Sequence, residues 1–361
     1  MIDAPTGRSA AASTDVLVIG DGVIGLSIAV ALARAGVACV VAGGSRPGAA
    51  SMTAGGLLAP SVGRVAAPAQ AFYDASLALY PAFVDSLREF DPELRMIEGL
   101  LVVRAAQAAA VDPTARELAP AQAAALEPAL VAPHGAAFYA GDGAVDNERL
   151  TRAARAAAVA LLGPARVLAD DVARVEPGPH GVAVTTASGA RIEAGTVVLA
   201  AGAWVSHIAG LPRAIPVEPV KGQMIALASA PLHHAVIGNG VYVVPRGGET
   251  LVGSTLERTG FDTSTDTATA DRLHAAAAVL CPTLGDAPRS RAWAGLRPGT
   301  PDMLPIIGRD PEFPSVVYAC GHSKNGILLA PATAAAVAAM IGGHDSGLDL
   351  APFAIERFSS N

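Results

Sequence analysis

The chain has 361 residues, of which 52% are hydrophobic and 16% charged, and its 25 basic and 32 acidic residues give a formal net charge of −7. This length suffices for two domains or one large one, and an acidic chain without a dense cluster of Lys and Arg is not expected to bind nucleic acid. We also expect no membrane span, because glycine, proline or a charge interrupts every apolar run before the roughly 20 residues that a span requires.

The N-terminal segment and the three cysteines indicate a cytoplasmic protein. Residues 1–14 are small and polar, lack the apolar stretch of a secretory signal, and are expected to form a flexible tail. Cys39, Cys281 and Cys320 are odd in number and widely spaced, so we expect neither a disulfide framework nor a CxxC site. The eight histidines show no HxxxH or HExxH spacing, and no metal is expected.

The first motif is a glycine-rich turn between a strand and a helix. Residues 15–19 form a β-branched apolar run typical of a strand buried on both faces. The sequence Gly-Asp-Gly-Val-Ile-Gly follows over residues 20–25, and an apolar stretch over 23–35 indicates a helix that Gly36 ends. Residues 37–41 are expected to form a second buried strand. In such a unit GxGxxG favours a dinucleotide pyrophosphate at the helix N-terminus.

The residue that ends the second strand departs from the usual dinucleotide pattern. A carboxylate there commonly hydrogen-bonds the adenosine ribose hydroxyls, but this chain has Ala42, and Arg46 follows shortly after. A small residue followed by an arginine is one signature of NADP. The alternative is an FAD site that has lost a hydrogen-bonding pair, at a cost of about 1 to 3 kcal/mol, so that FAD binds weakly and part of the protein is apo. The small residues of 47–60 favour FAD, because a flavin cofactor can lie close along such a backbone.

The middle of the chain carries few chemical signals. Residues 65–140 are expected to be mainly helical, with a short strand over 100–103, and another helix is expected over 150–162. Strands over 167–205 end in a run that continues into Ala-Ala-Gly at residues 200–202. That run either closes a nucleotide-binding sheet or is an ordinary core strand.

The C-terminal third begins with alternating strands. Those over 218–227, 241–246 and 250–255 predict a separate antiparallel sheet. A last strand is expected over 316–320, followed by a closing helix over 332–341.

Five segments, taken in order, carry a family resemblance: GDGVIG, the KGQM strand, YVVPR with VGST, GLRPGTPDMLPIIG and GHSKNGILLAPATA. Together, over residues 15–341, they resemble the glycine oxidase branch of the D-amino-acid oxidase family. The resemblance implies an α/β (α+β) fold, in which a Rossmann-like FAD-binding domain carries an inserted, mainly antiparallel substrate domain. It also implies oxidation of the Cα–N bond of an amino acid to an imine, with dioxygen reoxidising FAD to give hydrogen peroxide.

The resemblance further implies a discontinuous organisation. Residues 15–80, 145–215 and 290–345 are expected to form the FAD-binding domain, and residues 81–144 and 216–289 the substrate-binding domain. FAD is expected to be non-covalent, because no cysteine lies in the GLRPGTPD segment, where sarcosine-oxidase relatives attach the flavin. A homo-oligomer is expected, since glycine oxidase relatives suggest a tetramer.

Three residues are expected to bind substrate. Arg297 matches the family's carboxylate-binding arginine, and a planar guanidinium suits that task. Tyr242 matches the family tyrosine whose hydroxyl reaches the same carboxylate, and Lys324 stands where relatives have arginine. The alternatives are an ion pair between domains for Arg297, a packed core tyrosine for Tyr242 and a solvated charge for Lys324. No catalytic acid or base is assigned, because hydride transfer to FAD needs none on the reacting carbon.

The FAD-binding residues implied by the resemblance lie in the glycine-rich turn, at the end of the second strand, in the small-residue segment, near the middle strands and in the GHSKNG segment. They are Gly20, Gly22, Val23, Ile24, Gly25, Ala42, Gly43, Ala50, Ser51, Gly55, Gly56, Leu57, Val172, Ala201, Gly202, Trp204, His322, Ser323, Asn325, Gly326, Ile327 and Leu328.

The resemblance favours glycine, sarcosine or D-alanine as substrate and thiamine thiazole biosynthesis as the setting. The alternatives are a D-amino-acid or N-methyl amino-acid oxidase or dehydrogenase on the same fold, and a degenerate flavin-binding protein, for which Ala42 is the only support. The only two lysines, Lys221 and Lys324, both lie in segments that carry the resemblance.

Overall fold

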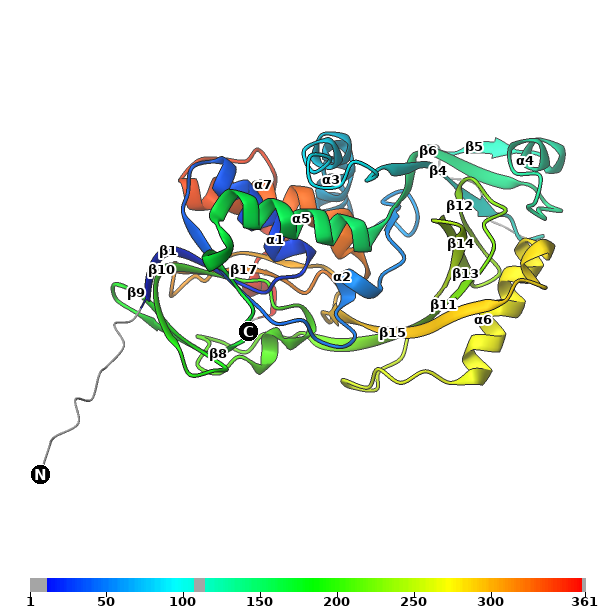
Figure 1. Ribbon diagram of the computed structural model, residues 1–361. Coiled ribbons are helices and arrows are strands. Elements are labelled where there is room, and N and C mark those ends of the chain that lie inside the picture. Colours follow the sequence, from blue (N-terminus) through cyan, green and yellow to red (C-terminus); the bar gives the residue numbers. More distant parts are fainter. Residues whose placement is uncertain (1–11, 107–113, 359–361) are drawn as a thin grey trace, which may run out of the picture.

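The computed structural model describes residues 12–106 and 114–358, and it contains two large sheets that lie next to each other (Figure 1). Residues 1–11 of the expected tail lie outside the described residues. Residues 12–14 correct that expectation, because they open the first strand and pair with residues 192–194.

The first sheet is the predicted dinucleotide-binding sheet. Its main path runs β16-β17-β10-β1-β2-β7, and every neighbouring pair is parallel except β16 with β17. A hairpin of β8 and β9 joins the sheet through β10. The bounds are β1 (Ala12–Ile19), β2 (Cys39–Ala42), β7 (Val167–Leu168), β8 (Val172–Gly178), β9 (Gly181–Thr186), β10 (Arg191–Leu199), β16 (Ile306–Arg309) and β17 (Val316–Cys320).

Helices cover one face of this sheet. They are α1 (Val23–Arg34), α3 (Ala67–Asp85), α5 (Asn147–Leu162) and α7 (Gly326–Gly342). Three of them lie on the upper left of Figure 1, and α3 lies at the top centre. Helix α1 packs between α5 and α7, and α3 packs on α7. Small residues allow this close approach: α1 buries Gly25 and Ala29, and α5 buries Ala154 and Ala157. The alanine-rich composition therefore serves helix packing in this half of the molecule.

Helix α7 begins at Gly326, six positions before the expected start at residue 332, and it continues through Pro331. A proline lacks the N–H that would bond the carbonyl four residues earlier. Here the hydroxyl of Tyr80 on α3 donates to the Ile327 carbonyl at 2.5 Å, and that of Ser76 donates to the Leu328 carbonyl at 2.7 Å. The Tyr80 hydroxyl thus replaces the donor that Pro331 lacks, Ser76 bonds the next carbonyl, and the helix is not broken.

The segment Ser323–Gly342 is long and apolar enough, by length and composition, to cross a membrane. Lys324, Gly326 and Pro331 interrupt this segment, as the expectation of short apolar runs requires, although its overall composition still passes that criterion. Most of its side chains are buried against α1 and α3. This is the environment of a core helix, whose apolar surface is used up in packing.

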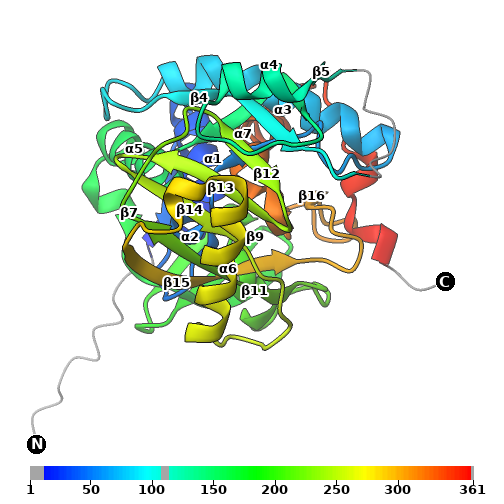
Figure 2. The same cartoon turned by 90° about the vertical axis from the view of Figure 1, so that its right-hand side faces the viewer.

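The second sheet has the order β15-β11-β14-β13-β12-β4-β6-β3, with β5 on β6. All its pairs are antiparallel except β12 with β4. Helix α6 (Thr267–Leu280) packs across β11, β13 and β14, as Figure 2 shows, and α4 (Pro120–Leu126) lies near β5. The bounds are β3 (Leu57–Leu58), β4 (Met96–Val103), β5 (Arg116–Leu118), β6 (Ala136–Val145), β11 (Glu218–Leu227), β12 (Ala235–Gly238), β13 (Val241–Arg246), β14 (Glu249–Gly253) and β15 (Arg289–Gly299).

The sheets do not follow the expected boundaries in two places. Strand β3 lies within the expected range 15–80, yet it pairs with β6 in the second sheet. Strand β15 lies almost wholly within the expected range 290–345, yet it pairs with β11 along its length. Within residues 65–140, helices α3 and α4 agree with the predicted helices and β4 contains the predicted strand at 100–103, but β5 and β6 were not expected. Strands β3 and β15 therefore belong to the second sheet, although the sequence placed them with the first.

Candidate cofactor and substrate site

One large cavity lies at the carboxyl ends of the parallel strands and extends to the second sheet. The residues that follow β1, β2, β10 and β17 form one wall, the segment 49–57 forms another, and β11 and β15 close the far end. This is where open parallel sheets bind their ligands. The cavity therefore joins the predicted cofactor residues to the predicted substrate arginine.

The glycine-rich turn is packed so closely that side chains have no room. Gly20 has φ +117°, and a Cβ on it would lie 2.3 Å from the Ala200 carbonyl oxygen. A Cβ on Gly22 would lie 2.9 Å from Ser51 Oγ, and one on Gly25 would lie 1.9 Å from the Gly20 carbonyl oxygen. The bare backbone leaves the N-terminal turn of α1 open to the cavity, where its positive dipole end favours a pyrophosphate.

Most predicted FAD-binding residues line this cavity, and three do not. Gly25 is turned toward Gly20, Asn325 donates to the Tyr73 hydroxyl at 3.5 Å, and Leu328 is buried in the core beneath the helices. The lining also includes residues that are not among the predicted FAD-binding or substrate-binding residues, and they are Ile19, Asp21, Gly44, Arg46, Ala49, Thr53, Ala54, Asp171, Ala173, Ala187, Ala200, Ala203, His207, Ile208, Gly222, Met224, Gly295, Pro298, Ala319, Cys320 and Gly321.

Arg297 reaches the cavity from β15, where it is paired with Val220 of β11. Its guanidinium donates to Ser254 Oγ at 2.6 Å and to the Thr255 carbonyl at 3.1 Å. A Cβ on Gly222 would lie 2.3 Å from one of its terminal nitrogens, so glycine is required there for the side chain to pass. A third, longer hydrogen bond goes to the Lys221 carbonyl at 3.4 Å, and a guanidinium has five N–H groups. Donors therefore remain for a carboxylate.

Tyr242 lies beside Arg297 but does not line the cavity. Its hydroxyl contacts Met224 Sδ at 3.3 Å, and its ring fills the space that a Cβ on Gly55 or Gly253 would occupy. Burial raises the pKa of its hydroxyl, and the neighbouring Arg297 opposes that rise. The structure thus brings the two predicted residues together, with Tyr242 behind the wall that Met224 forms.

Lys324 and His322 line the cavity just before α7. Lys324 is exposed, and its ammonium has no carboxylate within 4 Å among residues 12–106 and 114–358. His322 is buried, and burial lowers its pKa to about 3, so it is neutral at physiological pH. One of its ring nitrogens, Nε2, lies 3.1 Å from Thr333 Oγ1. Lys324 therefore supplies positive charge at this end of the cavity, and His322 does not.

Lys221, the other lysine, has a structural position. Its ammonium is buried and pairs with Asp262 at 2.5 Å, while its carbonyl accepts a hydrogen bond from Arg297. It does not line the cavity.

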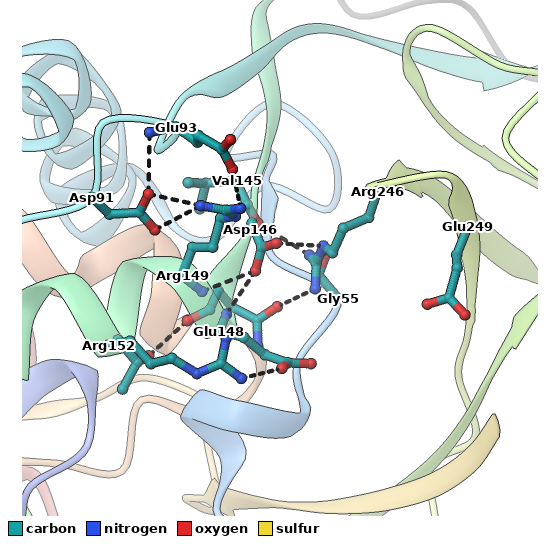
Figure 3. A network of polar contacts seen from close by, with 12 residues as sticks. Gly55, Asp91, Glu93, Val145, Asp146, Glu148, Arg149, Arg152, Arg246 and Glu249 are labelled. Carbon is teal, nitrogen blue, oxygen red and sulfur yellow. Dashed lines mark hydrogen bonds and ion pairs between the residues drawn. The ribbon is translucent and has the colours of Figure 1, made fainter. Parts of the chain in front are cut away.

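Arg246 fixes the segment between the two sheets. It donates to the carbonyls of Gly55 at 3.0 Å and Val145 at 3.2 Å and to Asn147 Oδ1 at 2.7 Å. Figure 3 shows its guanidinium between Gly55 and Asp146, next to the exposed ion pairs of Arg149. Burial lowers the pKa of Arg246, and Asp146 opposes that change. The arginine thus holds the backbone of the small-residue segment against the start of α5.

The comparisons with known proteins decide the family. A family model described as "FAD dependent oxidoreductase" matches residues 15–340. The chain belongs to this FAD-dependent oxidoreductase family. It is 35% identical to the glycine oxidase of Pseudomonas aeruginosa, covering 95% of this chain and 98% of that one. It is 33% identical to the bifunctional protein ThiO/ThiG of Trichormus variabilis, covering 95% of this chain and 55% of that one.

The fold agrees with this family. The crystal structure of glycine oxidase from Geobacillus kaustophilus superimposes with a TM-score of 0.87 at 29% identity, covering 96% of this chain and 99% of that one. The predicted α/β (α+β) fold class and the predicted FAD cofactor are confirmed. The residues present fit FAD, because the cavity combines a glycine turn without room for Cβ atoms, an open helix N-terminus and a wall of small residues. This FAD-dependent oxidoreductase acts on a small molecule.

Proposed function

We propose that this protein oxidises glycine or another small amino acid or secondary amine at the Cα–N bond. The imine product hydrolyses to an oxo acid and ammonia or an amine, and dioxygen takes the two electrons and two protons as hydrogen peroxide. One observation carries the proposal: Arg297 lines the same cavity as the glycine-rich turn, so a carboxylate held by the arginine lies in the cofactor's chamber. Relatives named glycine oxidase support a small substrate.

Bound FAD would supply the hydride acceptor, and the protein would position the substrate. Arg297 would grip the substrate carboxylate with the donors that Ser254 and Thr255 leave free. Gly222 and Gly295 keep the strands beside it bare. We assign none of the titratable lining residues, including His322, as a general base that removes a proton from the substrate Cα. Hydride transfer requires no such base.

We propose that FAD is non-covalent. Cys320 is the cysteine among the lining residues that the structure describes, and burial raises its thiol pKa to about 12. A thiol in that state is a poor nucleophile. The three cysteines are free and buried, which supports a reducing cytoplasm as the location. A homo-oligomer and a setting in thiamine thiazole biosynthesis complete the proposal.

The test is a peroxide-coupled assay of the purified holoenzyme against glycine, sarcosine, D-alanine and larger D-amino acids. We expect peroxide with the small substrates and weak or no turnover with bulky ones. Anaerobic bleaching of the flavin by a substrate, without peroxide in air, would make the protein a dehydrogenase. A colourless protein that takes up no FAD would contradict the oxidase.

Lys324 supports a second candidate, an oxidase for a substrate with a second anionic group. Its ammonium is a point charge at the cavity wall without a carboxylate partner among the described residues. Such a charge attracts an anion without demanding a planar fork. A solved structure of iminodiacetate oxidase from Chelativorans superimposes with a TM-score of 0.85 at 25% identity, covering 94% of this chain and 98% of that one.

Lys324→Met separates the two candidates. For a dicarboxylate substrate such as iminodiacetate, we expect KM to rise about 10-fold, the effect of losing one charge-assisted contact of about 1.5 kcal/mol. KM for glycine should change little. An equal rise for both substrates, or none for either, would exclude a role of Lys324 in choosing the substrate.

A further inference from the structure

A carboxylate lies at the rim of the cavity close to Ala42, but it comes from a different strand. Strands β2 and β7 are parallel neighbours, with Ala42 paired to Leu168, and the Gly43 amide donates to the Leu168 carbonyl at 3.2 Å. The two strands therefore end level with each other. Asp171, three residues after β7, lines the cavity together with Ala42.

Asp171 is bound to the loop that follows β2. Its Oδ1 accepts from the Gly44 amide at 2.9 Å, and its Oδ2 accepts from Arg46 Nε at 2.9 Å and from a terminal nitrogen of Arg46 at 2.8 Å. A Cβ on Gly44 would lie 3.0 Å from Oδ2, so glycine permits this approach. A carboxylate can accept about four hydrogen bonds. Its side chain is 31% exposed, and acceptor capacity remains toward the cavity.

The same contacts argue against a phosphate on the ribose. Arg46 is the cation that an NADP site would need, but its guanidinium already pairs with Asp171 and lies over the Trp204 ring, 5.3 Å from the centroid. A phosphate placed there would face the carboxylate of Asp171 and be repelled. Hydroxyl groups, which donate hydrogen bonds, suit this pair.

Asp21 is the other acidic residue among the described lining. It follows β1, and its Oδ2 accepts from Arg155 at 2.6 Å. Its place beside the glycine-rich turn belongs to the pyrophosphate end of a dinucleotide. Asp21 also lies beside the start of the loop after β2, since a Cβ on Gly43 would be 2.8 Å from its Oδ1. Asp171 differs in accepting hydrogen bonds from Gly44 and Arg46 of that loop.

We propose that Asp171 accepts the hydrogen bonds of the adenosine ribose hydroxyls of FAD, in place of a carboxylate at the end of β2, and that Arg46 positions it. The carboxylate that contacts the ribose would then follow β7, the strand adjacent to β2. The proposal depends on FAD binding and not on the substrate proposed above. It removes the ground for expecting weak FAD binding, since that expectation rested on Ala42 alone.

The experiment measures cofactor affinity without turnover. Dissociation constants are determined by flavin fluorescence for apoprotein with FAD and with the FAD analogue that lacks both adenosine ribose hydroxyls. The wild type should prefer FAD by at least about 10-fold, the effect expected for hydrogen bonds to a charged group. Asp171→Asn should bind FAD more weakly and lose the preference. Asp170→Asn, a change at an adjacent carboxylate that bonds Ser188 outside the cavity, should behave as wild type.

A purely structural role for Asp171 gives a different result. If the aspartate only anchored the loop, Asp171→Asn would weaken both ligands equally and keep the preference, and the proposal would be overturned. Arg46→Gln/Asp171→Asn removes both charges, so no unpaired guanidinium remains to impair folding; it too should lose the preference. Retained preference in that double variant also overturns the proposal, while an apoprotein that binds neither ligand would overturn the FAD assignment itself.

Discussion

Arg297 is held in place before any substrate arrives. Ser254 Oγ and the Thr255 carbonyl accept from its guanidinium, and Gly222 leaves the space through which it passes. Because these contacts already restrict the side chain, little rotamer entropy is lost when a carboxylate binds. The arginine is therefore expected to act mainly on substrate affinity.

Replacing Arg297 by alanine tests this role. We expect KM for glycine or another active small substrate to rise by about 10- to 100-fold, the range for losing charge-assisted hydrogen bonds to a carboxylate, with a smaller change in kcat. Steady-state kinetics of Arg297→Ala measure it. Arg289→Ala is the matched control, because Arg289 lies on the same strand and pairs with Asp271 away from the cavity. Equal KM values in both variants would remove Arg297 from the site.

The site residues differ in how far the sequence could predict them. Arg297 and the glycine-rich turn were predicted because motifs mark them locally. Asp171 was not, because its contact with Gly44 spans 127 positions of the chain. The pairing of β2 with β7 brings the two residues together. Strand β7 has only two residues, Val167–Leu168, which is too short to be recognised from hydrophobic periodicity.

Helix α7 contains Pro331, which lacks the N–H that would bond the Ile327 carbonyl. Helix α3 supplies a donor in its place. Tyr80 and Ser76 donate to the carbonyls of Ile327 and Leu328, and the Ala332 amide donates back to Ser76 Oγ at 3.3 Å. All of these groups are buried. Burial also raises the pKa of the Tyr80 hydroxyl, which stays protonated and can donate.

Tyr80→Phe should therefore destabilise the protein. It leaves a buried carbonyl of Ile327 without its donor, and such a loss costs about 1 to 3 kcal/mol. The measurement is the free energy of unfolding by urea. Ser86→Ala is the control, since its hydroxyl bonds the Phe83 carbonyl at the half-buried end of the same helix. A cost for Tyr80→Phe no larger than that of the control would show that water replaces the hydroxyl.

Sequence patterns predicted the helices and strands unevenly. Residues 15–19 and 316–320 were predicted as strands, because continuous β-branched runs identify them. Strand β6 was missed within a range expected to be helical. Its sequence, Ala-Ala-Phe-Tyr-Ala-Gly-Asp-Gly-Ala-Val, has too many small residues for either a period of two or one of 3.6 to stand out. Tertiary pairing with β3, β4 and β5 decides its conformation.

At acidic pH, the stability of the whole molecule should depend on the buried carboxylate of Asp310. Burial alone would raise the pKa of Asp310, but hydrogen bonds from Arg213 and the Tyr318 hydroxyl, and from the amides of Phe313 and Glu312, lower it to about 2. A pKa below the unfolded value near 3.9 means that stability is present above about pH 4 and is lost as the pH falls toward 2. The contribution is about 2 kcal/mol.

Asp310→Asn should flatten this pH dependence. The free energy of unfolding of the wild type should fall between about pH 5 and pH 2 more steeply than that of the variant, which lacks the titrating group. Urea unfolding at several pH values measures both slopes. Parallel curves would show that other carboxylates determine the acid sensitivity.

The two sheets are also assembled from separate stretches of the chain. The FAD-binding sheet takes strands from both ends of the described residues, and the second sheet takes β3 and β15 from ranges expected to belong to the first. The strands of each sheet therefore do not follow the residue ranges expected for the two domains. Strand β15 shows why, since this strand of 11 residues pairs with β11 in the second sheet although most of its residues lie in a range expected for the FAD-binding domain.

The place of β17 and α7 has a consequence for biosynthesis. Strand β17 pairs with β10, α7 packs on both α1 and α3, and the segment between them lines the cavity. These elements leave the ribosome after the glycine-rich turn, β10 and the whole second sheet. The nascent chain therefore presents a cofactor turn without its opposite wall for most of translation. We therefore expect FAD to bind stably only after β17 and α7 have been synthesised and have closed the cavity.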